Sequence, residues 1–337
     1  MVRRGPSVAV LYRILRANVL SFVGFVLVVA IVAVAVAVVL APHLLVPYGA
    51  NQETGVYHAP PTVLRWPPSF AHPFGTDDAS LDLYSEILLA LPLDLGIAFA
   101  ISGVALLGGG ALGLLAGFYD RPGTLAGFAS AVILRTTDVF LAFPSLLLGF
   151  AIVAALGFGL GQAMIAILLT WWPYYVRLVR GEVLAVKHLP YVTAARAAGV
   201  SERRILLRHV LRNVLDPIVV YFTLDIGTVL VTFSTIAFVI PGVVSYPRPP
   251  EWGSMLSFFD LNYPISQYWW EIAFPSAAIF VTALAFSLLG DGLRDVLDPR
   301  SRKALAETAA PSPPAVKASA YGGPAPSAAA PATSEGP

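Results

Sequence analysis

Residues 187–213 read KHLPYVTAARAAGVSERRILLRHVLRN, a basic stretch between two long apolar runs. Pro190 and Gly199 are placed to begin and end a short helix, because proline fits the first helical turn and glycine fits the residue after the last one. Ser201 can then cap a second helix that has Glu202 in its first turn. The stretch therefore predicts a helix–turn–helix, which is more order than a plain connecting loop requires.

The two predicted helices present different surfaces. The first has a smooth face of small side chains, which lets another surface approach closely: Ala194, Ala195, Ala197 and Ala198. The second combines an apolar face with a basic stripe at every fourth residue. The apolar face consists of Leu207, Val210, Leu211 and Val214, and the stripe of Arg204, Arg208 and Arg212. Charge alone is compatible with an ordinary cytoplasmic loop, and the spacing is what favours a docking element.

The composition indicates that lipid surrounds most of this chain. Hydrophobic residues make up 57% of the 337 residues and charged residues only 12%, against about 25% charged residues in soluble domains. Because the apolar residues occur in long runs, they predict membrane spans. There is no cysteine, which excludes disulfides and thiolate sites. The net charge of +1 gives no general attraction for nucleic acid.

Six apolar runs predict an all-α polytopic membrane protein with six transmembrane helices. Residues 1–17 form a cytoplasmic N-terminus, residues 18–42 a first span too long for a cleavable signal, and residues 43–88 an external loop. The other five spans, in a core at 89–300, are expected at 91–118, 134–156, 162–179, 215–240 and 272–289. Residues 301–337 are rich in Ala, Pro, Ser and Gly and predict a disordered cytoplasmic tail.

The distribution of basic residues sets the orientation. Of the 21 Lys and Arg residues, the six-span arrangement places only Arg65 and Arg248 outside. Positively charged residues concentrate on the cytoplasmic side of membrane proteins. The sequence therefore predicts a multi-pass protein of the plasma membrane with both termini in the cytoplasm.

Further motifs occur at the ends of the spans. Residues 72–78 read HPFGTDD before the second span, where Asp77 or Asp78 could cap the following helix. Residues 172–184 read WPYYVRLVRGEVL, and residues 250–256 read PEWGSML. Residues 289–300, after the last span, read LGDGLRDVLDPR.

Together with the run 191–199, these motifs resemble permeases of binding-protein-dependent ABC importers. The resemblance covers about residues 72–300 and points to the dipeptide, oligopeptide and nickel subfamily, in its C-type subunit. It implies the type I ABC importer permease fold, a membrane subunit that is not an enzyme and needs no cofactor. It also implies four kinds of partner: a homologous permease that completes a heterodimer, two ABC ATPase subunits, an external solute-binding protein and the lipid bilayer.

In that family the stretch corresponding to 187–213 is the EAA loop, a coupling helix that seats in a groove of the ATPase. The residues assigned to this role by resemblance are Tyr191, Ala194, Ala195, Arg196, Gly199, Ile205 and Arg208. Two positions depart from the family pattern: Thr193 stands where glutamate is usual, and Arg212 where proline is usual. Near the second span, residues 81–83 replace the usual Gly-Arg-Asp.

Two acidic residues lie inside predicted spans, where a charge is costly unless it is paired or hydrated. For Asp138 we favour pairing with Arg135 or an interfacial position over a role in substrate binding. Asp225 has no basic neighbour in sequence, so we expect it to face the translocation pathway or a partner helix rather than lipid. It could recognise an amino-bearing substrate, or serve as a protonated, hydrogen-bonded structural residue.

Other functions have less support in the sequence. There is no P-loop and no HExxH or GxSxG motif, and the five histidines show no metal-site spacing. A channel or secondary transporter that works without an ATPase is the main alternative, and a membrane enzyme is weaker because no catalytic set is evident. Peptides are the default cargo by resemblance, while nickel and oligosaccharides stay open.

Overall fold

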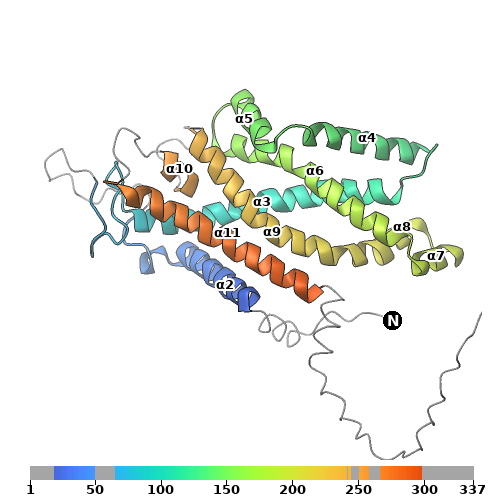
Figure 1. Ribbon diagram of the computed structural model, residues 1–337, viewed down its shortest axis with the longest axis horizontal. Helices are drawn as coiled ribbons and strands as arrows, with labels where there is room; N and C mark the ends of the chain where they lie inside the picture. Colours follow the sequence, from blue (N-terminus) through green and yellow to red (C-terminus); the bar gives the residue numbers. More distant parts are fainter. Residues whose placement is uncertain (1–18, 50–64, 241, 244–249, 258–265, 298–337) are drawn as a thin grey trace, which may run out of the picture. The chain divides into compact units, whose positions relative to one another are not determined.

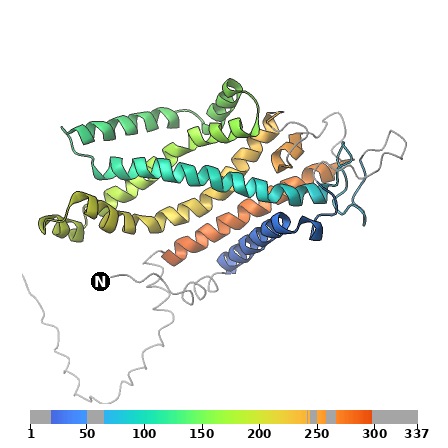
Figure 2. The ribbon, with the colours of Figure 1, turned by 180° about the vertical axis from the view of Figure 1, so that it is seen from behind.

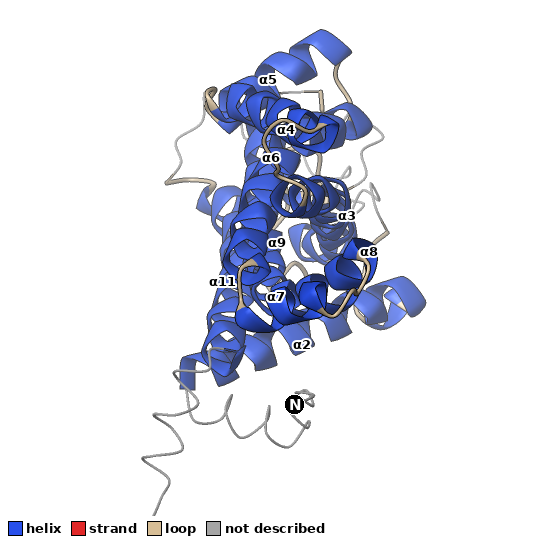
Figure 3. Ribbon diagram, turned by 90° about the vertical axis from the view of Figure 1, so that its right-hand side faces the viewer, coloured by secondary structure: helices blue, strands red, loops and turns tan. Residues whose placement is uncertain are grey.

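The computed structural model describes residues 19–49, 65–240, 242–243, 250–257 and 266–297 (Figure 1). Within these ranges the regular structure is helical, apart from one isolated β-bridge between Thr76 and Asp82 (Figure 3). The expected cytoplasmic N-terminus at 1–17, the expected tail at 301–337 and Arg248 lie outside the described residues.

Five long helices form the framework: α2 (Val19–Leu40), α3 (Leu83–Phe118), α6 (Leu160–Lys187), α9 (Leu211–Val239) and α11 (Trp269–Leu297). Helix α3 packs along α6 and also contacts α9, as Figure 2 shows from behind. Helix α11 lies between α9 and α2. A short 3-10 helix, η1 (Pro42–Leu44), follows α2. The core is therefore built on α3, α6 and α9.

Glycines allow α3 and α6 to approach closely. Gly109, Gly113 and Gly117 recur every fourth residue and lie on the face of α3 that meets α6. A Cβ atom added at Gly113 would lie 2.5 Å from the backbone oxygen of Val176. The small-residue stripe that the sequence suggested is thus a helix–helix contact, in which backbone meets backbone.

The third predicted span, at residues 134–156, is not one straight helix. The chain forms α4 (Leu125–Leu141) and α5 (Ser145–Leu156), which meet at an angle of 90°. The break falls at Pro144, the residue before α5. Proline disfavours helical geometry in the residue that precedes it, so α4 ends at Leu141, a few residues before Pro144.

Within the described residues, four helices are long and apolar enough to cross a membrane, and the bent pair α4–α5 would make a fifth. These four are Val19–Leu40, Leu83–Phe118, Glu202–Val239 and Trp269–Asp295. The predicted span 162–179 lies in α6, which does not belong to this set. Helix α6 contains Trp172, Arg177 and Arg180, and it packs against α3, α5 and α9, so less of its surface would meet lipid. The described residues thus provide four or five candidate spans and do not confirm the count of six.

The HPFGTDD motif organises the start of α3 differently from the prediction. The helix begins at Leu83, eight residues before the apolar run, and its N-cap is Asp82 rather than Asp77 or Asp78. The Asp82 carboxylate accepts hydrogen bonds from the Ser85 backbone N–H at 2.9 Å and the Ser85 hydroxyl at 2.6 Å. Asp77 instead accepts the backbone N–H of Leu81 at 2.8 Å and closes the preceding turn.

The PEWGSML motif forms a short helix whose first residues are buried. Helix α10 (Trp252–Ser257) packs between α3, α9 and α11. The Trp252 backbone N–H donates to the Asp94 carboxylate at 3.1 Å, and its indole donates to the Ile87 carbonyl at 3.0 Å. Glu251 accepts the backbone N–H groups of Gly253 and Ser254 at 2.8 and 2.6 Å. These bonds attach the segment before the last span to the core.

Candidate functional site

The predicted helix–turn–helix is present between α6 and α9. It consists of α7 (Pro190–Ala197), a turn, α8 (Glu202–Arg204) and the π-helical turn η3 (Ile205–Val210), which continues into α9. Pro190 occupies the first position of α7, as the sequence indicated. Because α6 ends at Lys187 and α9 begins at Leu211, the loop joins two of the three core helices.

The turn after α7 is a Schellman motif, which requires a left-handed residue. Gly199 has φ +75°. Its N–H donates to the Arg196 carbonyl at 3.1 Å, and the N–H of Val200 donates to the Ala195 carbonyl at 3.1 Å. A Cβ atom added at Gly199 would meet nothing within 4 Å. Backbone conformation, rather than lack of space, is therefore what favours glycine at this position.

The apolar face of the second helix differs from the prediction. Val210 and Val214 are buried as expected, but Leu207 is 50% exposed and Leu211 only partly buried, while Ile205 and Leu206 turn inward. The π-helical turn changes the register, since it holds more residues per turn than an α-helix. Ser201 occupies the N-cap position of α8 without forming a side-chain cap bond.

An apolar cluster, here called the loop cluster, anchors the helix–turn–helix from within. Its buried members are Phe118, Val179, Val183, Val186, Val192, Ile205, Leu206, Val210, Val214 and Ile218. They come from α3, α6, α7, η3 and α9. The loop is consequently packed against the helices that it connects.

Polar contacts attach the loop to the turn between α3 and α4. The Glu202 carboxylate pairs with Arg121 at 2.7 Å and with Arg196 at 3.1 Å. The Lys187 ammonium donates to the Gly117 carbonyl at 2.9 Å. Exposed ion pairs contribute only about 0–1 kcal/mol each, so these contacts orient the loop more than they stabilise it.

The residues assigned to the coupling role divide into two groups. Five are exposed, and all but Arg208 lie on or beside α7: Tyr191, Ala194, Arg196, Gly199 and Arg208. Ala195 is partly buried against the loop cluster, and Ile205 is completely buried within it. The smooth exposed surface of α7 is therefore formed by Ala194 and Ala197, with Ala198 beyond them, and Ala195 supports it from inside. The basic stripe Arg204, Arg208 and Arg212 is exposed as predicted.

Asp138 does not pair with Arg135. Its carboxylate accepts the Arg177 guanidinium of α6 at 2.9 Å, across the contact between α4 and α6. Both side chains are more than half exposed. The sequence identified the need for a cation but not which one, because the partner lies on another helix.

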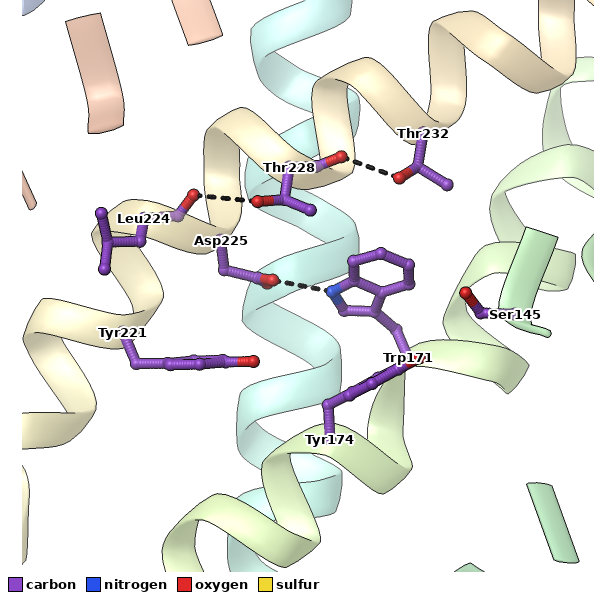
Figure 4. A pocket seen from close by; sticks show the side chains of 8 residues that line it. All are labelled: Ser145, Trp171, Tyr174, Tyr221, Leu224, Asp225, Thr228 and Thr232. Carbon is purple, nitrogen blue, oxygen red and sulfur yellow. Dashed lines mark hydrogen bonds between the residues drawn. The ribbon is translucent and has the colours of Figure 1, made fainter. Parts of the chain in front are cut away.

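A polar cavity of about 400 Å³ lies between α5, α6 and α9 (Figure 4). Its lining is Ser145, Trp171, Tyr174, Tyr221, Leu224, Asp225, Thr228 and Thr232. Asp225 is 5% exposed, and its two carboxylate oxygens accept the Trp171 indole N–H and the Tyr175 hydroxyl, each at 2.8 Å. Asp225 thus borders a cavity and contacts a neighbouring helix.

The aromatic partners of Asp225 and the threonines beside it were not predicted as site residues. The threonines carry a signal that sequence reading could have used, since polar residues recur along α9 at helical spacing. Trp171 and Tyr175 carry none, because their link to Asp225 depends on how α6 packs against α9. Among the residues that the structure describes, no group of His, Asp or Glu is arranged to hold a metal ion.

Comparison with known proteins shows which family this sequence matches. Residues 109–303 match the family described as "Binding-protein-dependent transport system inner membrane component". This range contains α6, the helix–turn–helix, the cavity and the described part of the last long helix.

Several relatives are similar to this chain over most of their length. The chain is 41% identical over 235 residues to the probable D,D-dipeptide transport system permease protein DdpC of Escherichia coli K12, covering 70% of this chain and 76% of the relative. It is 40% identical over 233 residues to the glutathione transport system permease protein GsiD of Pectobacterium atrosepticum, covering 69% and 74%. It is 37% identical over 292 residues to the dipeptide transport system permease protein DppC of Alkalihalophilus pseudofirmus, covering 86% and 89%. The chain therefore belongs to the family of inner-membrane permease components of binding-protein-dependent transport systems.

Proposed function

We propose that this permease subunit imports short peptides, and that ATP hydrolysis in partner subunits drives the import through residues 187–213. The observation that carries the proposal is the ordered helix–turn–helix at residues 190–210 within a chain of this family. The cargo is inferred from the relatives, whose names refer to dipeptides, D,D-dipeptides and glutathione. All three are short peptides or peptide-like molecules.

The packing of the loop supports a coupling role. Val192 of α7 is completely buried in the loop cluster together with Val183 of α6 and Val214 of α9. A protein interior is densely packed and transmits displacement with little compression. A partner that moves α7 would therefore move the ends of α6 and α9, which border the cavity at residues further along the same two helices.

The exposed side of α7 has the features of a docking surface. Ala194 and Ala197 present small side chains, and Tyr191, which is 40% exposed, adds an aromatic group of the kind enriched at protein interfaces. Arg208 adds an exposed charge from η3. A groove in a cytoplasmic ATPase is the partner that we infer for this surface, with two ATPase subunits serving two permeases.

We further infer six spans, with both termini in the cytoplasm. The bent pair α4–α5 would supply the third span and α6 the fourth, although α6 carries more polar residues than the other spanning helices. Packing against α3, α5 and α9 makes this possible, because neighbouring helices rather than lipid cover much of α6. A homologous permease would complete the pathway, and an external solute-binding protein would deliver the peptide.

Two measurements, co-purification of the ATPase and peptide uptake into vesicles, test this proposal. The tagged permease, expressed with the permease, ATPase and binding-protein genes beside its own, is purified in detergent and placed in lipid vesicles. We expect ATPase subunits to co-purify and radiolabelled L-alanyl-L-alanine to enter the vesicles only when ATP and the binding protein are present. Uptake without ATP, or purification without any ATPase, would favour a channel or secondary transporter instead.

A further inference from the structure

One face of α9 stays polar over several turns of a membrane helix. Its members follow one another at intervals of three or four residues, so they share a side of the helix: Tyr221, Asp225, Thr228, Thr232 and Thr235. The first four line the cavity, and Thr228 is exposed, so the cavity reaches the surface of the chain. A polar face of this kind is costly in lipid, and it therefore borders water or another protein.

The carboxylate in this cavity is held in place by neutral groups. The Trp171 indole occupies one oxygen of Asp225 and the Tyr175 hydroxyl occupies the other. A carboxylate offers about four acceptor positions, so a position remains for a further donor even with the Ser102 hydroxyl as a third neighbour. Among the described residues no Lys, Arg or His forms an ion pair with Asp225. The carboxyl group is thus oriented in advance, and none of these ion pairs supplies it with a cation.

The threonines beside Asp225 add acceptors rather than donors. The Thr232 hydroxyl donates to the Thr228 carbonyl at 2.8 Å, and the Thr228 hydroxyl points to the Leu224 carbonyl at 3.4 Å (Figure 4). Their hydrogens are directed into the helix backbone, which leaves the oxygen lone pairs for a ligand. With Asp225, the cavity therefore presents three acceptors from consecutive turns of α9.

Aromatic rings complete the lining of the cavity. Trp171 and Tyr174 of α6 lie with ring centroids 5.5 Å apart, and Tyr221 stands on α9 one turn before Asp225. Aromatic faces attract cations. Neither the rings nor the acceptors would favour an anion.

We infer that this cavity binds the α-ammonium group of the transported peptide, with Asp225 as the charge partner and Thr228 and Thr232 as further acceptors. A primary ammonium has three N–H donors, which matches the three acceptors. The volume of about 400 Å³ leaves room for the adjoining residues of the peptide, and it falls within the range of small-molecule sites, about 300–1,000 Å³. This inference rests on the proposed import of peptides and identifies the chemical group that the pathway recognises.

Recognition of an ammonium predicts discrimination against peptides whose N-terminus is blocked. An N-acetyl group removes the charge and would leave the Asp225 carboxylate without the ammonium partner that a free peptide provides. Sites built around a polar group of the substrate discriminate strongly against analogues that lack it. The ratio of import rates for free and acetylated peptide is therefore the quantity to measure.

The experiment uses the complete transporter in lipid vesicles with radiolabelled L-alanyl-L-alanine and its N-acetyl form. The test variant is Asp225→Asn, whose amide can still accept from Trp171 and donate to the Tyr175 oxygen. The control is Asp216→Asn, which removes a charge from an exposed position on the same helix, outside the cavity. The same binding protein serves every arm, so its own selectivity cancels.

We expect the ratio of free to acetylated import to fall at least tenfold in Asp225→Asn and to stay unchanged in Asp216→Asn. An unchanged ratio in Asp225→Asn would overturn the inference, whether both rates stay normal or both fall equally, because an equal fall indicates a purely structural role. If Asp225→Asn does not insert, the ratio of free to acetylated import is measured in the double variant Thr228→Val and Thr232→Val instead. A fall in that ratio supports the inference, and an unchanged ratio overturns it. Failure of the wild-type transporter to import either peptide would instead refute peptide import itself.

Discussion

At the scale of single residues, close packing between α3 and α6 depends on the absence of a side chain. The Cβ that alanine would add at Gly113 lies 2.5 Å from the backbone oxygen of Val176, and a backbone atom cannot move aside as the end of a flexible side chain can. Gly108, on the same helix, is exposed and would meet nothing within 4 Å. Gly113 therefore has no space for a side chain, whereas Gly108 on the same helix has space for one.

We predict that Gly113→Ala lowers the melting temperature of the purified protein and that Gly108→Ala does not. Overpacking of this kind costs about 1–3 kcal/mol, whereas alanine at an open helical position gains up to about 1 kcal/mol in helix propensity. Thermal unfolding of both variants in the same detergent measures the difference. Equal melting temperatures would show that α3 and α6 do not meet at this glycine.

At the scale of elements, a titratable side chain, Glu251, lies just before helix α10 and accepts hydrogen bonds from the first turn of that helix. Burial raises the pKa of Glu251 to about 7, although hydrogen bonds from the backbone N–H groups of Gly253 and Ser254 oppose this rise. Asp94 of α3, which accepts the Trp252 N–H, is the nearby acidic group. The folded protein therefore holds a proton on Glu251 at a pH where the unfolded chain, with an ordinary glutamate pKa near 4.5, releases it.

We predict that stability falls as pH rises from about 4.5 to about 7 and that Glu251→Gln weakens this dependence. The sign follows because the folded state binds more protons than the unfolded state in this range, so a rise in pH favours unfolding. Above about pH 7 the carboxyl is ionised in both states and adds no further slope. Melting temperatures of wild type and variant across the range provide the measurement, and parallel curves would contradict the assignment to Glu251.

The elements also show where sequence reasoning succeeds and fails. Pro190 and Gly199 were sufficient to locate α7, because local backbone preferences fix both ends of a short helix. The break at Pro144 was missed, since an apolar run of sufficient length predicts a span whether or not it bends. The π-helical register of residues 205–210 was also missed, and with it the burial of Ile205, because that register is set by packing in the loop cluster.

At the scale of the whole molecule, contacts between distant segments decide the polar sites. The cation paired with Asp138 is Arg177, and the donors to Asp225 come from Trp171 and Tyr175. In each case the sequence identified the residue that needs a partner but not the partner, which only the packing of α4 or α9 against α6 supplies. Family membership and the predominance of helix, by contrast, were evident from motifs and apolar runs.

The topology yields a prediction for the complete chain. Because only Arg65 and Arg248 among 21 basic residues fall outside in the six-span arrangement, reporter fusions near residues 60 and 255 are expected to report an external location. Fusions near residues 195 and 310 are expected to report the cytoplasm. A consistent reversal near residue 195 would show that the α4–α5 pair or α6 does not cross the membrane as inferred, and a reversal at any other site would contradict the six-span arrangement.

The most direct test of the central claim compares two glycines that have the same backbone strain. Gly199 and Gly123 have φ +75° and +77°, and an added Cβ meets nothing within 4 Å at either position. Valine at either would cost about 1–2 kcal/mol, but Gly199 lies in the turn that ends α7, whereas Gly123 lies in the turn between α3 and α4. The measurement is peptide imported per ATP hydrolysed by the reconstituted transporter, together with the amount of ATPase that co-purifies.

We predict that Gly199→Val inserts at the wild-type level, retains less ATPase and loses import, whereas Gly123→Val keeps both. Import by Gly199→Val at the wild-type rate, with the ATPase still bound, would contradict the assignment of residues 187–213 as the coupling element.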